Sequence, residues 1–101
     1  MAKPRIEIPQ QSLVDFCRRH HIQKLSLFGS VLGDSFTSDS DIDVLVEFEA
    51  GHVPGLALIR MQDELSQLLG GRIVDLVTPK FLNRRIRKIV QSEAVPQYVQ
   101  G

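Results

Sequence analysis

The sequence predicts an α+β domain in which a small mixed sheet of three or more strands is packed by helices. Apolar residues make up 43% of the 101-residue chain and charged residues 24%, which is typical of a globular protein and not of a disordered one. Segments with helical spacing of apolar residues alternate along the chain with short strand-like segments. Because this length supports one hydrophobic core, we expect a single domain over residues 1–101.

The N-terminal part predicts a helix and then a strand. Apolar residues recur at helical spacing after a proline, which indicates a helix over residues 9–21. Residues 24–28 alternate and stop at Gly29, a pattern typical of a short strand. The polar segment 34–40 is rich in turn-forming residues and predicts a loop. The apolar stripe of the helix consists of Leu13, Phe16, Cys17 and His20.

The segment DIDVLVEFE, residues 41–49, has the strongest strand pattern. Successive side chains of a strand point to opposite faces, so Asp41 and Asp43 share one face. A carboxylate inside an otherwise apolar strand costs several kcal/mol unless something pairs it. These two aspartates therefore need a partner or a function. The opposite, apolar face consists of Ile42, Val44, Val46 and Phe48.

The C-terminal part predicts a helix over residues 56–69, a strand over 72–78 and a last helix over 78–94. Asp75 interrupts the predicted strand. The last helix is expected to start at a threonine cap followed by proline. The tail 95–101 is expected to become ordered only on a partner. The predicted order is α-β-β-α-β-α, with three strands covered by helices.

The three strand aspartates together predict a metal site. If the strand that holds Asp75 lies beside the strand of Asp41 and Asp43, three negative charges meet and raise one another's pKa unless a cation neutralises them. Ligands that consist only of oxygen suit Mg²⁺ or Mn²⁺, which also bind phosphate oxygens. Asp41, Asp43 and Asp75 are therefore the predicted metal ligands and catalytic residues.

Gly29 and Ser30 supply a complementary feature. Glycine at the end of a strand lets the backbone approach a ligand, and a helical turn beginning at Ser30 points its N–H groups at an anion. Together with the aspartates, this predicts a site for a metal-bound triphosphate whose phosphorus is open to an incoming hydroxyl. Catalysis there would rest on positioning and charge neutralisation.

Two other interpretations of the aspartates remain. The segment 39–43 imitates the start of a calcium loop, but Val44 and Ala50 stand where that loop has glycine and glutamate. The second alternative is structural, with Asp43 and Asp75 paired to arginines such as Arg72. The glycine-serine pair upstream and the third strand aspartate both favour the metal site over these alternatives.

The stretch GSVLGDSFTSDSDIDVLVEF resembles the signature of the DNA polymerase β-type nucleotidyltransferase superfamily. Over about residues 20–95 the chain is similar to the minimal nucleotidyltransferases of bacteria and archaea. The resemblance implies the polymerase β-like fold and carries roles to individual residues. Gly29 and Ser30 would hold the nucleotide phosphates, and Asp41 and Asp43 would bind the metal ions. Asp75 would complete the metal site and help to deprotonate the acceptor hydroxyl.

The same resemblance implies a partner. Minimal nucleotidyltransferases are commonly encoded beside a helical HEPN ribonuclease toxin, and they transfer AMP from ATP to a tyrosine of that toxin and silence it. The alternative is a catalytically weak antitoxin that neutralises its partner by binding. Gly33 and Asp34 motivate this alternative, because many relatives have a basic residue and then a glycine at these positions. Transfer to a small molecule such as an aminoglycoside is a weaker third interpretation.

Charge and composition bear on nucleic-acid binding, membrane association, location and disulfide bonding. The net charge is zero, so no global field attracts nucleic acid or an anionic membrane. No apolar run approaches the roughly 20 residues that span a bilayer, and no signal peptide is present, so we expect a cytoplasmic protein. A single cysteine excludes an internal disulfide. A basic cluster can contact ATP phosphates, RNA or an acidic partner, or can be only a solvated helix face: Arg84, Arg85, Arg87 and Lys88.

Overall fold

The protein folds around a four-stranded mixed sheet with the strand order β3-β2-β1-β4. The computed structural model describes residues 6–34, 36–37, 39–52 and 54–100. β1 runs antiparallel to β2 and to β4, whereas β2 and β3 are parallel. The strands are β1 (Ile22–Phe28), β2 (Ile42–Phe48), β3 (Val74–Val77) and β4 (Val95–Val99), and the α-helices are α1 (Gln10–Arg19), α2 (Ala57–Leu68) and α3 (Arg84–Glu93).

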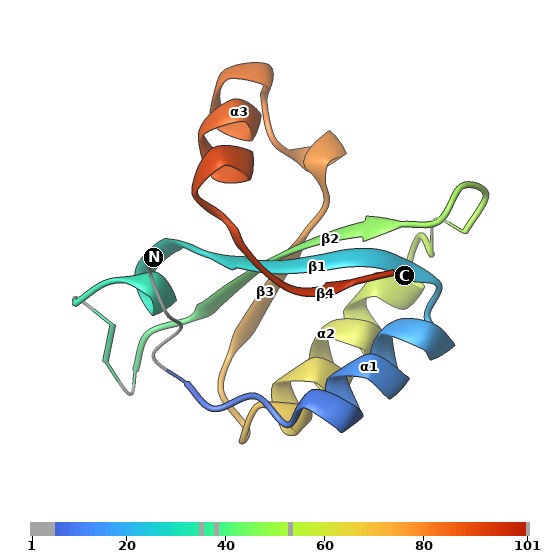
Figure 1. Ribbon diagram of the computed structural model, residues 1–101, viewed down its shortest axis with the longest axis horizontal. Coiled ribbons are helices and arrows are strands. Elements are labelled where there is room, and N and C mark those ends of the chain that lie inside the picture. The colour runs from blue at the N-terminus through green and yellow to red at the C-terminus, as the bar shows by residue number, and fades with distance from the viewer. Residues whose placement is uncertain (1–5, 35, 38, 53, 101) are drawn as a thin grey trace.

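Helices cover the two faces of the sheet unequally. α1 and α2 lie side by side on one face, whereas α3 stands on the other side of the sheet (Figure 1). The apolar face of β2 that the alternation predicts is buried against α1 and α2. Within the described residues, no helix has the length and hydrophobicity that a membrane-spanning segment needs. The core between the sheet and these two helices includes Leu13, Phe16, Cys17, Ile42, Val44, Val46, Met61 and Leu65.

The prediction for the C-terminal tail was wrong. Residues Val95–Val99 form β4, which pairs antiparallel with β1 and adds a fourth strand to the three that were predicted. Pro96 hides this strand in the sequence, because proline lacks the N–H that a strand between two neighbours must donate. β4 lies at the edge of the sheet and has only one neighbour, so a proline is tolerated there.

The start of the last helix was also predicted wrongly. Pro79 begins a short 3-10 turn, η2 (Pro79–Phe81), and α3 begins only at Arg84. Asn83 caps α3, since its side-chain oxygen accepts a hydrogen bond from the Ile86 backbone N–H at 2.9 Å. Proline fits the first turn of a helix, but here the chain leaves the helical conformation after one turn. The helix is therefore shorter than predicted.

Glu64 ties α2 to the end of α1. Its carboxylate accepts a hydrogen bond from Arg19 Nη1 and pairs with His20 Nε2, each at 2.5 Å. Burial acts to raise the pKa of Glu64, but the hydrogen bonds and positive charges of His20 and Arg19 outweigh burial and lower it. A carboxylate with a lowered pKa in the folded state stabilises the protein above its unfolded-state pKa, and this contribution is lost as the pH falls.

Glu64→Gln should lower the free energy of unfolding by about 0.5–1 kcal/mol at neutral pH, a small effect because the pair is partly exposed and screened. The difference from the wild type should shrink as the pH falls below about 4, where the wild-type carboxylate also becomes neutral. Urea unfolding at neutral and acidic pH measures both values. Asp63→Asn, on the exposed side of α2, is the matched control. An equal loss at both pH values would contradict the charge-based explanation.

Candidate active site

Gly29 brings the end of β1 against a carboxylate of β2. The chain leaves β1 at Phe28 and enters the 3-10 turn η1 (Gly29–Leu32) with Gly29 at a φ of +77°, in the left-handed region that favours glycine. A Cβ atom at this position would overlap Oδ2 of Asp43. Both the backbone conformation and the close approach therefore require glycine here. The predicted glycine-serine pair therefore lies against Asp43, one of the predicted aspartates.

The strand register brings two of the three predicted aspartates directly together. In the parallel pair of β2 and β3, Asp43 is the register partner of Asp75, so the two side chains lie on the same face of the sheet. Asp41 precedes β2 and lies two residues from Asp43, which directs it to that face as well. Asp41 and Asp75 are exposed, whereas Asp43 is half-buried. The register thus produces the expected approach of Asp75 to Asp43.

Asp43 is the electrostatic centre of this group. Burial raises its pKa, and the negative charges of Asp75 and Asp41 raise it further. These are the two effects expected of a carboxylate that shares a site with like charges. A bound cation would remove the repulsion, because the attraction of a divalent ion for three carboxylates exceeds the repulsion among them at the same distances.

The donor set fits a hard divalent cation. All three side chains offer oxygen, and Mg²⁺ needs only one or two protein carboxylates when phosphate oxygens and water complete its octahedron. In the part of the chain that the structure describes, no three histidine, cysteine or acidic side chains are close enough to form a preformed metal site. An ion with its nucleotide would therefore complete its coordination with ligands from outside the chain. The metal-ligand roles of Asp41, Asp43 and Asp75 stay a prediction.

Arg72 does not support the structural alternative, in which arginines pair with Asp43 and Asp75. Arg72 donates from Nη1 to the carbonyl oxygen of Thr37 at 3.4 Å, and its guanidinium carbon lies 4.9 Å from the ring centroid of Phe36. Arg72 thus holds the loop between η1 and β2. Among the described residues, neither Asp43 nor Asp75 forms an ion pair with a basic side chain.

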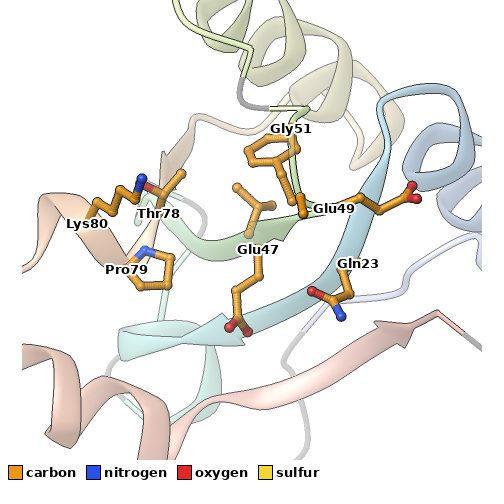
Figure 2. Close-up of a pocket in the computed structure, with 10 residues that line it drawn as sticks. Gln23, Glu47, Glu49, Gly51, Thr78, Pro79 and Lys80 are labelled. Carbon is orange, nitrogen blue, oxygen red and sulfur yellow. The ribbon is translucent and has the colours of Figure 1, made fainter.

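A cavity of about 380 Å³ lies at the other end of β2 (Figure 2). It forms because β3 ends at Val77 while its neighbour β2 continues to Phe48, which leaves one edge of β2 without a strand. Sequence analysis missed this cavity, since no local pattern shows that two parallel strands differ in length. Its lining includes Gln23, Val46, Glu47, Phe48, Thr78, Pro79 and Lys80.

The cavity is separate from the aspartates. Glu47, in its lining, and Asp43 are four residues apart on β2, which corresponds to about 13 Å along an extended strand. Figure 2 shows Thr78, Pro79 and Lys80 on one side of the cavity and Gln23 on the other. The group formed by Gly29, Ser30 and the three aspartates is therefore the candidate active site, and the cavity adds a second recess on the same sheet.

Comparison with known sequences places the chain among nucleotidyltransferases. The family described as the nucleotidyltransferase domain matches residues 11–96. Protein adenylyltransferase MntA of Thermococcus cleftensis is 38% identical over 78 residues, which cover 76% of this chain and 76% of that protein. A Methanocaldococcus jannaschii protein, provisionally named a protein adenylyltransferase, is 31% identical over 86 residues, covering 85% of this chain and 90% of its own length.

Solved structures agree with the sequence relatives. A structure provisionally described as a minimal nucleotidyltransferase superposes with a TM-score of 0.72 at 38% identity, covering 86% of this chain and 87% of that chain. A toxin-antitoxin structure with AMP-PNP superposes with a TM-score of 0.74 at 21% identity, over 92% of this chain and 75% of that chain, and shows the same fold. The predicted fold class and family are both confirmed. The chain belongs to the nucleotidyltransferase domain family and, within it, to the minimal nucleotidyltransferases.

Proposed function

We propose that the protein transfers AMP from ATP to a tyrosine hydroxyl of a partner HEPN toxin in a metal-dependent reaction, and that it acts as the antitoxin of this partner. The observation that carries the proposal is the approach of Gly29 to Asp43, with Asp75 as the strand partner of Asp43. It puts a turn suited to phosphate beside carboxylates suited to a divalent ion.

The comparisons support the acceptor class. The Thermococcus relative is named a protein adenylyltransferase, so a protein acceptor is the simplest expectation for a chain 38% identical to it. A structure of the MntA-HepT toxin-antitoxin pair shares the fold, with a TM-score of 0.64 at 20% identity. The tyrosine acceptor and the HEPN class of the partner rest on the family resemblance of the sequence.

In the proposed reaction, the acceptor oxygen forms a bond to the α-phosphorus of ATP while the bond from that phosphorus to the bridging oxygen breaks. Pyrophosphate leaves and AMP stays on the acceptor. Backbone N–H groups at Gly29 and Ser30 bind phosphate oxygens, and Asp75 helps to remove the hydroxyl proton. Asp41 and Asp43, with Asp75, would hold Mg²⁺ or Mn²⁺, which supplies charge neutralisation on the triphosphate.

Transfer of label from ATP carrying a radioactive α-phosphate tests the proposal. The purified protein, Mg²⁺ and an extract of its host should yield one labelled protein band, and the Asp41→Asn/Asp43→Asn variant should yield none. Mass spectrometry of the band would identify the acceptor and the modified side chain. Omission of the divalent ion should abolish the label as well, because the ion neutralises the triphosphate.

The same double variant separates the proposal from the binding-antitoxin alternative. If Asp41→Asn/Asp43→Asn neutralised the toxin in cells as well as the wild type does, complex formation would be sufficient and the catalytic proposal would fail. Loss of neutralisation together with loss of label would support catalysis. The alternative is motivated by Gly33 and Asp34, which stand where many relatives have a basic residue and then a glycine.

A further inference from the structure

α3 and the turn before it expose several large apolar side chains. Phe81 is 74% exposed, Ile86 45% and Ile89 51%. Ile86 and Ile89 are three residues apart and hence neighbours on the helix surface. Among the residues of α3, only Val90 is buried. The helix therefore buries Val90 and presents a separate apolar stripe to solvent.

Arg87 makes η2 and α3 one structural unit. Its side chain is half-buried and donates from Nε to the Pro79 carbonyl oxygen at 2.7 Å and from Nη2 to the Leu82 carbonyl oxygen at 3.1 Å. These bonds hold the segment that carries Phe81 against the helix that carries Ile86. Phe81 is thus presented with the apolar stripe of α3.

Basic side chains flank these apolar residues. Lys80 on η2 and three residues of α3 are exposed, and within the described residues none of the four forms an ion pair. Arg85 lies one helical turn from Ile89, so apolar and basic stripes run side by side. We call this group the α3 surface, and it consists of Phe81, Ile86 and Ile89 with Lys80, Arg84, Arg85 and Lys88.

The α3 surface belongs to the side of the sheet that carries the aspartates. A small cavity of about 110 Å³ separates Leu45 and Glu47 of β2 from Gln91 and Ala94 at the end of α3. Leu45 and Glu47 lie two and four residues after Asp43 on β2, so all three side chains point to the same face of the sheet. α3 therefore stands over the catalytic face, and in Figure 1 it lies on the side opposite to α1 and α2.

We infer that the α3 surface docks the acceptor protein, and that the docked segment is apolar with acidic side chains at its flanks. The inference rests on the proposed function, since it names the surface that binds the protein whose hydroxyl receives AMP. Complementary charge at the flanks and an apolar centre are the usual composition of a specific protein interface. A partner bound there covers the same face as Asp43 and can bring a hydroxyl to the nucleotide.

The charge pattern argues against two other occupants. A second copy of this chain would pair the surface with itself in a two-fold dimer and would place Arg85 and Lys88 against like charges. Nucleic acid would neutralise the basic residues and its bases can stack on Phe81, but it offers nothing to cover the aliphatic side chains of Ile86 and Ile89. An acidic and apolar protein segment satisfies both parts of the surface.

Two synthetic amphipathic helical peptides with the same apolar residues, one flanked by glutamate and one by lysine, test the charge pattern. Fluorescence anisotropy should show that the wild type binds only the glutamate peptide. Ile86→Ser/Ile89→Ser should weaken this binding about tenfold or more. Arg85→Glu/Lys88→Glu should no longer bind the glutamate peptide and should bind the lysine peptide instead. A misfolded variant would bind neither peptide, so this switch cannot result from misfolding.

The matched control is Leu56→Ser/Ile59→Ser, which removes two exposed apolar side chains, 88% and 64% exposed, at the start of α2. Its affinity for the glutamate peptide should equal that of the wild type. Absence of binding to the glutamate peptide would overturn the inference. Binding of RNA or of phosphatidylserine vesicles would also overturn it if the Ile86→Ser/Ile89→Ser variant lost that binding. So would a wild-type dimer in sedimentation that the same variant does not form.

The labelling assay then separates this inference from the proposed function. With limiting host acceptor, both α3 variants should transfer about tenfold less AMP, while their affinity for MgATP stays at the wild-type value. Undiminished labelling by both variants would overturn the docking surface and leave the proposed function intact. Charge-selective peptide binding without any labelled protein, even for the wild type, would instead overturn the proposed function and leave the docking surface.

Discussion

Asp43→Asn should lower the rate of AMP transfer at least about 100-fold. Asp43 is the half-buried member of the aspartate group, with Asp75 opposite it in the register and Asp41 two residues before it. In the proposed reaction Asp43 would hold the metal-bound triphosphate. Loss of one such carboxylate costs several kcal/mol of transition-state stabilisation, and about 1.4 kcal/mol corresponds to a factor of ten. Initial rates of label transfer to the identified acceptor measure the effect.

The same substitution should leave the melting temperature in the absence of divalent ions unchanged or raise it. Burial and the charges of Asp75 and Asp41 raise the pKa of Asp43, so the ionised carboxylate is unfavourable in the folded protein and a neutral amide removes that cost. Asp63→Asn is the matched control, because Asp63 is an exposed carboxylate of α2. A fall in both activity and melting temperature would instead indicate that Asp43 serves the fold.

Gly29→Ala should impair both stability and catalysis. An L-residue in the left-handed region costs about 1–2 kcal/mol, and the added Cβ atom would also overlap Asp43 Oδ2. Either the turn or the Asp43 side chain must move, which separates the backbone that we propose to bind phosphate from the carboxylates. We expect a lower melting temperature and a rate of AMP transfer reduced about tenfold to 100-fold, since small misplacements of reacting groups have effects of this size.

Gly33→Ala is the matched control for this prediction. Gly33 lies four residues further along, and its φ of −125° suits any residue. Among the described residues, a Cβ atom there would meet only the Ser30 carbonyl oxygen, at an ordinary 3.9 Å. Thermal denaturation and the transfer rate should both stay near the wild-type values. If the two alanine variants behaved alike, the special requirement for glycine at position 29 would be wrong.

Much of the local structure could be predicted from periodicity. Alternation in residues 41–49 correctly assigned Asp41 and Asp43 to the face opposite the apolar side chains, and the helical stripe at Leu13 and Phe16 is buried as expected. The errors concern elements whose local pattern is ambiguous. Pro96 concealed β4, and Pro79 suggested a helix start at a place where the chain makes only one 3-10 turn.

The sequence by itself determined which residues can serve the chemistry, because backbone geometry sets which side chains of one segment share a face and because Gly29 tolerates a left-handed φ. Only the tertiary structure decided which of them meet. The parallel register of Asp43 with Asp75 and the open position of α3 depend on long-range packing between segments about 30 or more residues apart. No local pattern contains that information, since pairing partners are selected by burial of the whole core.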